Sequence, residues 1–314
     1  MGDEEKWARE SLREIALEGI RERRRARRWA IFMRLLFLAV IVTLFFFTLR
    51  PSLQMGESAV SGPHTAVVQI NGPIMAGRPA NAERIIQGLE AAFEAAGARG
   101  VLLEINSPGG SPVASSRIYQ AIDRLREAHP DKPVHAVAGD MMASGAYYVA
   151  AAADQIHVDG ASIIGSIGVV SRGFGFSDAI QRLGIERRVY TAGEEKAGMD
   201  PFTPPEPDQV ERLRGMLDGI HDQFIAAVRE GRGDRLTGNP ETLFSGRVWT
   251  GSQGIEQGLA DGFGSPESVA REVIGAPDRV NYMPRRGLLD RALEQIGSAA
   301  VAAWVELQSP LDLR

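Results

Sequence analysis

The stretch "VHAVAGDMMASGAYYVAAAADQIHV", residues 134–158, holds the pattern that decides the fold of this chain. It begins with a short apolar run and passes through a loop that contains Gly139 and Ser144. An alanine-rich helical segment follows, and the stretch ends in a second apolar run, "QIHV". A strand, a helix and another strand in immediate succession are typical of a βαβ unit with parallel strands. This stretch therefore predicts an α/β protein.

The same alternation extends toward the N-terminus of the quoted stretch. Short runs rich in β-branched residues at 65–70 and 100–105 predict strands, and apolar residues at helical spacing over 82–97 and 115–128 predict helices. A further helical region is predicted over 203–232. Helices of this length between strands indicate a parallel sheet with helices packed on it.

Composition narrows the class of protein. The chain has 314 residues, of which 44% are hydrophobic, so it is long enough for one large globular domain plus appendages. Its net charge of -5 offers no basic field for nucleic acid. The absence of cysteine excludes disulfides, thiolate metal sites and a cysteine nucleophile. No motif indicates a metal or a cofactor, and none is expected.

The N-terminal segment combines a basic cluster with an apolar run. Residues 21–28 contain six arginines and one glutamate, and residues 29–49 are interrupted only by Arg34. About 20 apolar residues span a bilayer, and positive charge stays on the cytoplasmic side. We therefore expect a single-pass anchor over 29–49 in the inner (plasma) membrane, with residues 1–28 cytoplasmic and the rest extracytoplasmic. A cleavable signal peptide and a buried core helix are the alternatives.

Two loops follow predicted strands and carry the candidate chemistry. "NSPGGSP" spans residues 106–112, and "GDMMASGA" spans 139–146. Loops at the carboxyl ends of parallel strands gather at one edge of a sheet, so we expect Gly110 and Ser144 to face a common crevice. Ser144 at a helix start is either an N-cap or a nucleophile, and the N–H groups of Gly110 and Gly145 would then hold an oxyanion.

A nucleophilic serine needs a base. The five histidines lie outside both glycine-rich loops, so nothing favours a Ser-His-Asp arrangement, although the sequence leaves it open. Lys196 is one of only three lysines in a chain that otherwise uses arginine. Arginine does not lose its proton in proteins, whereas a lysine amine can act as a base when its environment disfavours the charge. Lys196 is therefore the candidate base.

Five motifs, in order, resemble the signal peptide peptidase A family (peptidase family S49) of membrane-anchored serine peptidases. They cover residues from about 65 to 265: "VLLEINSPGGSP", "MASGAYYVAAAADQIHV", "GSIGVV", "EKAGMDPFTPPE" and "FSGRVWTGSQGIEQGLADGFG". The resemblance implies a fold of the ClpP and crotonase type, with a Ser-Lys dyad in place of a triad. It also implies a homo-oligomeric ring that completes each site across subunits.

Carried over residue by residue, the resemblance makes Ser144 the nucleophile and Lys196 the general base, serving the Ser144 of a neighbouring copy. It makes Ser166 the serine that orients the lysine amine, and it places Gly110 and Gly145 in the oxyanion hole. One departure is that Glu194 and Glu195 directly precede the lysine. We expect their carboxylates to point to solvent. Four apolar residues are interpreted as lining a substrate groove or, alternatively, as core: Met141, Met142, Tyr147 and Ile167.

The expected organisation follows from these observations. Residues 63–284 form the catalytic domain, reached through a linker at 50–62 and followed by a helical tail at 285–314. The expected activity is hydrolysis of hydrophobic peptides, such as cleaved signal peptides, at the outer face of the membrane. The alternatives are a crotonase-type enzyme acting on acyl-CoA and a catalytically idle membrane scaffold.

Overall fold

The computed structural model describes residues 27–29, 31–43, 62–193 and 195–284. The compact unit that contains the sheet extends from Val60 to Pro284. In the other unit, residues 27–29 and 31–43 are helical. Among the helices of the described ranges, none has both the length and the apolar character needed to cross a bilayer.

Several predicted segments lie outside the described residues. They are residue 30 and residues 44–49 of the expected anchor, nearly all of the basic segment and the linker, and the C-terminal tail. The predictions for these segments stay predictions.

The predicted parallel sheet with helices between its strands is confirmed and fits a ClpP-like fold. The strands run in the order β6-β5-β3-β2-β1-β8, β4 also pairs with β3, and β7 pairs with β4. Every pairing is parallel except that of β5 with β6. The strands are β1 (His64–Asn71), β2 (Ala98–Ser107), β3 (Val134–Ala143), β4 (Gln155–Val158), β5 (Ile163–Gly165), β6 (Val248–Thr250), β7 (Gly262–Phe263) and β8 (Arg279–Asn281).

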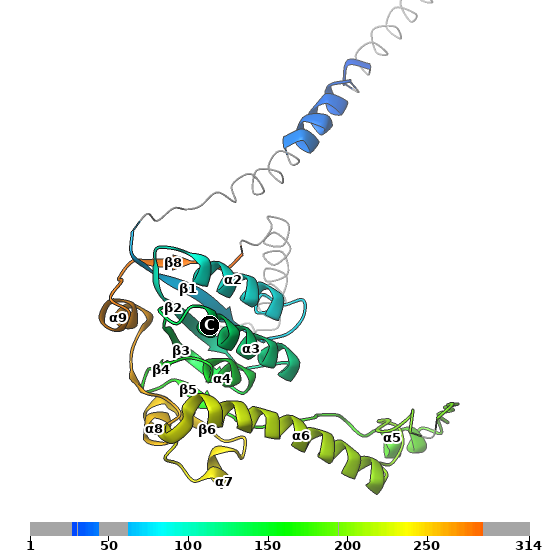
Figure 1. Ribbon diagram of the computed structural model, residues 1–314. Coiled ribbons are helices and arrows are strands. Elements are labelled where there is room, and N and C mark those ends of the chain that lie inside the picture. The colour runs from blue at the N-terminus through cyan, green and yellow to red at the C-terminus, as the bar shows by residue number, and fades with distance from the viewer. Residues whose placement is uncertain (1–26, 30, 44–61, 194, 285–314) are drawn as a thin grey trace, which may run out of the picture. The chain divides into compact units, whose positions relative to one another are not determined.

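Helices α2, α3, α4 and α6 cover one face of this sheet (Figure 1). The core between them consists of apolar side chains from both layers, for example Leu103 and Ile105 of β2 against Leu89 and Ile118. A smaller cluster on the opposite face is covered by η2. The helices are α2 (Ala82–Glu94), α3 (Pro112–Ala128), α4 (Gly145–Ala150), α5 (Ser177–Arg182), α6 (Pro207–Arg232), α7 (Pro240–Leu243), α8 (Gly251–Glu256), α9 (Pro266–Ser268), η1 (Gly233–Arg235) and η2 (Val269–Val273).

Local sequence explains where the two crossover helices begin. Asn81 caps α2 by accepting a hydrogen bond from the Arg84 N–H at 3.0 Å. Ser111 caps α3 in the same way, and Pro112 occupies the first helical position, where its missing N–H costs nothing. Because Ser111 directly follows the two glycines, the helix start also fixes one end of the glycine-rich loop.

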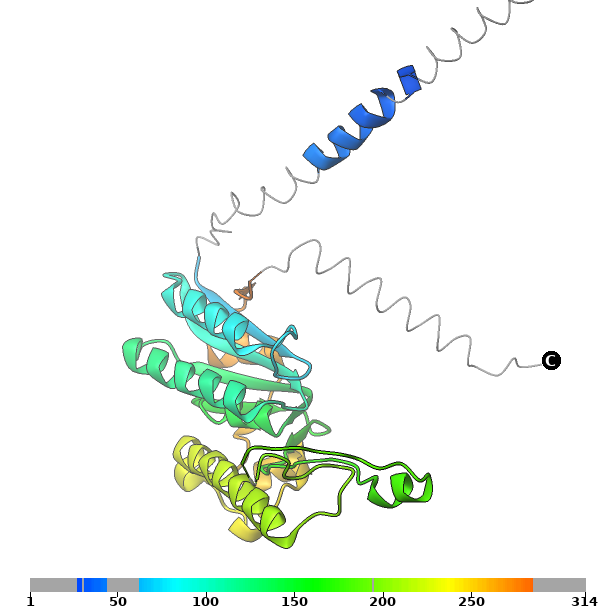
Figure 2. The ribbon, with the colours of Figure 1, turned by 90° about the vertical axis from the view of Figure 1, so that its right-hand side faces the viewer.

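A long exposed segment separates β5 from α6. We call residues 169–206, which contain the short helix α5, the arm. Figure 2 shows that α5 lies away from the sheet. The outgoing and returning segments of the arm contact each other. The Phe176 N–H donates to the Pro201 carbonyl at 2.6 Å, and the Phe176 and Phe202 ring centroids lie 5.6 Å apart. Its isolated position was not predicted from the sequence.

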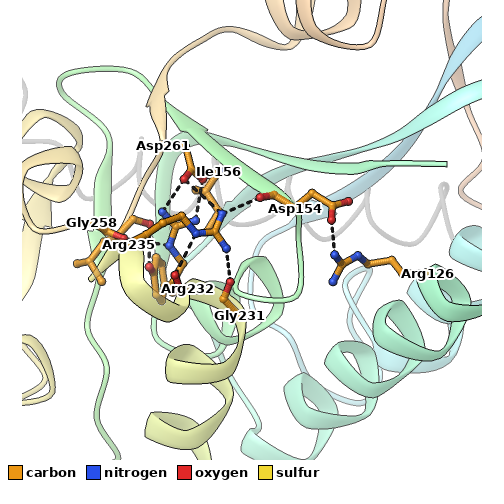
Figure 3. Close-up of polar contacts among 10 residues, drawn as sticks. Arg126, Asp154, Ile156, Gly231, Arg232, Arg235, Gly258 and Asp261 are labelled. Atoms are coloured by element: carbon orange, nitrogen blue, oxygen red, sulfur yellow. Dashed lines mark hydrogen bonds and ion pairs between the residues drawn. The ribbon is translucent and has the colours of Figure 1, made fainter. Parts of the chain in front are cut away.

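A buried ion pair attaches the C-terminal end of α6 to the sheet (Figure 3). Arg232, only 1% exposed, donates two hydrogen bonds to the Asp261 carboxylate, at 2.7 and 2.9 Å. Burial acts to raise the pKa of Asp261, but the Arg232 guanidinium and the Ile156 N–H outweigh it and hold that pKa below its ordinary value. Near this end of α6, Phe224 stacks on Tyr148 of α4 at 4.8 Å.

Candidate active site

Ser144 lies at the carboxyl end of β3, directly before α4, in a strained backbone conformation. Its φ is 53°, which costs a residue with a side chain roughly 1–3 kcal/mol. Its N–H donates to the Gly165 carbonyl at 2.8 Å, and its carbonyl accepts from the Tyr148 N–H at 3.0 Å. The Ser144 side chain makes no capping hydrogen bond among the described residues. Ser144 thus occupies the N-cap position of α4, as one interpretation expected, but its hydroxyl does not cap the helix and is left free for other chemistry.

The helix that follows Ser144 is buried and fixed in place by a hydrogen bond. All six residues of α4 are buried, and the Tyr147 hydroxyl donates to the Leu259 carbonyl at 2.7 Å. Burial raises the pKa of the Tyr147 phenol, so it stays a neutral donor. Tyr147, Met142 and Ile167 are fully buried. The interpretation of these three as groove residues is wrong, because they pack in the core.

The glycine-rich loop approaches Ser144 so closely that no side chain fits. A Cβ on Gly109, whose φ is 92°, would lie 2.6 Å from the Gly145 nitrogen and 2.8 Å from the Ser144 Cβ. A Cβ on Gly110 would lie 2.2 Å from the Ile74 carbonyl oxygen. The expectation that this loop and Ser144 share one edge of the sheet is confirmed, and the glycines are there because the backbones nearly touch.

Two backbone N–H groups next to Ser144 are available as donors. A Cβ built on Gly145 would lie 3.2 Å from the Gly110 nitrogen, so the two residues are neighbours. Neither the Gly110 nor the Gly145 N–H donates a hydrogen bond within the part of the chain that the structure describes. Two free donors beside a serine hydroxyl form the arrangement that stabilises an oxyanion.

Ser166 is brought next to Ser144 by strand pairing. Ala143 and Gly165 are partners in the β3–β5 ladder, so the residues that follow them, Ser144 and Ser166, leave the sheet side by side. Ser166 is half-buried with a φ of 55°, and its N–H donates to the Arg247 carbonyl at 2.8 Å. This position suits a serine that orients a group approaching Ser144.

Lys196 lies apart from this cluster, on the arm. It is exposed, and its N–H donates to the Gly193 carbonyl at 3.2 Å. Within residues 62–193 and 195–284, neither a hydrogen bond nor an ion pair joins Lys196 to Ser144 or Ser166. The structure of a single chain therefore brings together Ser144, Ser166, Gly110 and Gly145, but not Lys196.

The turn that carries Lys196 is attached to the first turns of α6. The Glu195 carboxylate forms an ion pair with Arg212 Nε at 3.1 Å, and the Met199 N–H donates to Gln209 Oε1 at 3.1 Å. The Glu195 carboxylate is exposed, as expected, but its partner Arg212 was not foreseen from the sequence. Glu194 lies outside the described residues.

Among the described residues, no histidine is hydrogen-bonded to Ser144. His221 of α6 donates a hydrogen bond from Nε2 to the Ile167 carbonyl at 3.1 Å. Because this nitrogen carries the proton, it is not free to accept one. His135 and His157 lie on β3 and β4 with ring centroids 5.8 Å apart and are buried. Among the described residues, no group of three His, Cys, Asp or Glu side chains has the arrangement of a metal site.

Comparison with known proteins finds similarity to a peptidase family. Residues 126–274 match the model of Peptidase family S49. The chain is 30% identical to the putative signal peptide peptidase SppA of Enterococcus faecium over 189 residues, which cover 60% of this chain and 54% of that protein. It is 32% identical to protease 4 of Haemophilus influenzae over 204 residues, which cover 64% of this chain and 32% of that protein.

A third relative has a name of another kind. A protein of Brucella abortus named Na(+)/H(+) antiporter NhaA is 44% identical over 237 residues, which cover 74% of this chain and 32% of that protein. The chain thus spans between about a third and about half of the length of these three relatives. The antiporter name describes a longer protein, of which the shared region is a minor part.

Proposed function

This chain belongs to peptidase family S49, a family of serine-type peptidases, and from that premise we propose that it is an endopeptidase with Ser144 as its nucleophile and Lys196 as its general base. The observation that carries the proposal is the free Ser144 hydroxyl beside two unused N–H donors at the edge of the sheet. The proposed substrates are hydrophobic peptides, such as cleaved signal peptides, in line with the name of the Enterococcus relative.

The proposed hydrolysis has two steps, acylation of Ser144 and hydrolysis of the acyl-enzyme. The Ser144 Oγ attacks the scissile carbonyl carbon while the Lys196 amine takes the hydroxyl proton, and the carbonyl oxygen becomes an oxyanion held by the Gly110 and Gly145 N–H groups. The C–N bond then breaks, and the leaving amine receives the proton from Lys196. Water, deprotonated by the same amine, hydrolyses the acyl-enzyme and restores Ser144.

We further propose that Lys196 acts on the Ser144 of a neighbouring copy in a ring. Lys196 is exposed on an arm whose apolar side chains are also exposed, among them Phe174 at 80% and Tyr190 at 90%. An exposed apolar surface of this kind is typical of an interface. Contact with a second copy would cover these side chains and would desolvate the amine, which favours its neutral form.

The cellular location is part of the same proposal. Residues 29–49 anchor the chain in the inner membrane with its N-terminus in the cytoplasm, and the peptidase unit acts on the extracytoplasmic side. The support is the run of arginines before a long apolar segment. This placement separates the enzyme from cytoplasmic acyl-CoA, which disfavours the crotonase alternative.

Mixing two inactive variants tests the dyad and its arrangement. Ser144→Ala and Lys196→Ala should each abolish hydrolysis of a synthetic signal-sequence peptide while keeping the wild-type melting temperature. Lys196→Arg should be equally inactive, because Arg keeps its proton. When the two alanine variants are unfolded and reassembled together in equal amounts, about a quarter of the sites join an intact serine to a neighbour's intact lysine, so activity returns.

The outcomes separate the possibilities. If no activity returns, Lys196 acts within its own chain, and an active Lys196→Arg variant excludes the lysine as base. His221→Ala is the control for a histidine base and should stay active. A wild-type chain that neither cleaves the peptide nor reacts at Ser144 with a fluorophosphonate supports the idle scaffold, and tight binding of CoA supports the crotonase alternative.

A further inference from the structure

Ser107 is a fully buried hydroxyl at the carboxyl end of β2, two residues before the first glycine of the glycine-rich loop. Its Oγ accepts a hydrogen bond from the Gly109 N–H at 3.1 Å. The intervening residue, Pro108, has no N–H of its own. The peptide unit between Pro108 and Gly109 is therefore held by a side chain of the loop itself.

The next peptide unit is held from the other side by Ile74. The Ile74 N–H donates to the Gly109 carbonyl at 2.9 Å, and the Ile74 carbonyl accepts from the Ser111 N–H at 2.8 Å. Every peptide bond in the described residues is trans, so the Gly110 N–H points opposite to the Gly109 carbonyl. Fixing that carbonyl on Ile74 therefore turns the Gly110 N–H away from Ile74.

The three consecutive backbone N–H groups of residues 109–111 show the consequence. The Gly109 N–H donates to Ser107 Oγ, and the Ser111 N–H donates to the Ile74 carbonyl. Of these three N–H groups, that of Gly110 is the one without an acceptor in the described part of the chain. Two consecutive glycines allow many backbone conformations, so this direction depends on the hydrogen bonds on both sides.

We propose that Ser107 is a positioning residue of the oxyanion hole, which acts by accepting the Gly109 N–H and so directs the Gly110 N–H toward the oxygen activated by Ser144. This inference rests on the proposed function. Without the Ser107 hydroxyl, the buried Gly109 N–H lacks its acceptor and the Pro108–Gly109 unit is free to rotate. The Gly110 donor then loses its fixed direction, although Ser144 and Lys196 are unchanged.

The test compares Ser107→Ala with a matched control in the full-length chain. Ser162→Ala is the control, because Ser162 is also a buried serine whose Oγ accepts a backbone N–H, that of Asp159, at 3.2 Å. For Ser107→Ala we expect kcat on a signal-sequence peptide to fall about 10- to 100-fold with KM within about threefold, since loss of a whole oxyanion donor costs about 10²–10³. Ser162→Ala should keep kcat.

A second measurement, of inhibitor binding, tests the oxyanion hole separately from the rest of the site. A peptide aldehyde forms a hemiacetal with Ser144 whose oxygen occupies the hole, whereas the corresponding peptide alcohol binds without one. Ser107→Ala should weaken the aldehyde by about the same factor as kcat and leave the alcohol unchanged. Ser107→Thr, which retains the hydroxyl, should restore most of both values.

The possible results either support or overturn the role of Ser107. A folded Ser107→Ala variant with wild-type kcat, or one that weakens aldehyde and alcohol equally, overturns the inference and leaves the proposed function intact. If Ser107→Ala does not fold, Ser107→Cys, which keeps the volume but is a weak acceptor, takes its place with the same expected loss. A wild-type chain that does not cleave the peptide and is not labelled at Ser144 overturns both proposals together.

Discussion

The two candidate catalytic groups lie in opposite surroundings. Ser144 follows a central strand and precedes a buried helix, and its backbone N–H and carbonyl are both hydrogen-bonded. Lys196 lies on the exposed arm, attached to α6 through Glu195 and Met199. Ser144 and the N–H groups of Gly110 and Gly145 are therefore positioned by this chain alone. Among the described residues, Lys196 has no hydrogen bond or ion pair with Ser144 or Ser166.

This difference shows how the work of a site is divided. Groups whose geometry must be accurate to a fraction of an ångström are held by a core that tolerates little change. A group delivered to another copy has to be exposed before assembly, and its precision comes from the interface. The predictions below test this contrast, from the largest expected effect to the smallest.

Substitution of two glycines that both have a positive φ, Gly109 beside Ser144 and Gly184 on the arm, should give the largest difference between the two regions. Gly109→Ala introduces a Cβ into contact with the Gly145 nitrogen, whereas Gly184 of the arm, with a φ of 67°, has nothing within 4 Å. We expect Gly109→Ala to lower kcat/KM by more than about 100-fold, because the oxyanion donors must move. Gly184→Ala should cost only about 1 kcal/mol of stability, from its positive φ. Steady-state kinetics and thermal melts check both.

Polar substitution on the arm should weaken assembly rather than chemistry. Tyr190→Asp places a charge on a side chain that is 90% exposed in one chain. If this surface contacts a second copy, activity measured at nanomolar enzyme concentration should fall by about tenfold, because dilution separates the copies. The activity should recover at higher enzyme concentration. Sedimentation velocity measures the assembly. Val273→Asp, on η2, is the control and should change neither quantity.

Stability should decrease in acid because of the buried His135–His157 pair. Burial lowers the pKa of both imidazoles below the ordinary 6.5, and charge on His157 lowers that of His135 further, while Asp154 and Asp261 act in the opposite direction. The unfolded chain therefore takes up protons at a higher pH than the folded chain. The stabilisation is complete above pH 6.5 and is lost progressively as the pH falls below it.

Calorimetry between pH 7.5 and 5 checks this prediction. Each unit of difference in pKa corresponds to about 1.4 kcal/mol, so several degrees in melting temperature are expected over this range. His157→Gln should flatten the dependence, whereas substitution of the half-buried His129 should not. A melting temperature that is the same at both pH values would contradict the assignment.

The smallest effect is expected at the ion pair beside Lys196. Arg212→Gln removes the partner of the Glu195 carboxylate, so the turn that carries Lys196 loses one of its attachments to α6. We expect kcat/KM to fall by less than about threefold at low salt and to stay unchanged at high salt, because the pair is exposed and screened. Glu195→Gln should have the same effect, and the double variant should add nothing to it. A larger loss in the double variant would assign the effect to something other than this ion pair.

Local sequence predicted the framework because the framework depends on local physics. The first three strands, both crossover helices and the helix after Ser144 follow from apolar periodicity and caps such as Asn81 and Ser111. The closeness of Gly110 and Ser144 followed from the rule that carboxyl ends of parallel strands share an edge. These elements were therefore predictable without coordinates.

Other features had no local signal. Strands β5 and β6 have three residues each, too short for a periodic pattern. Yet the pairing of β5 with β3 sets Gly165 against Ala143, next to Ser144, and the pairing of β5 with β6 sets Gly165 against Val248. The Arg212 partner of Glu195 was likewise hidden, because it comes from a different element. The mistaken groove residues Met142, Tyr147 and Ile167 show the same limit, since apolar side chains in a core and in a groove look alike in a sequence.

By itself, the sequence determined the α/β class, the candidate hydroxyl and amine, and the glycines that let two backbones approach. These depend on residue type and on spacing along the chain. Only the tertiary structure decided that Ser144 is strained and does not use its hydroxyl to cap α4, that Ser107 accepts the Gly109 N–H, and that Lys196 lies on the exposed arm. Those features arise from hydrogen bonds and packing between segments distant in sequence, which no local pattern encodes.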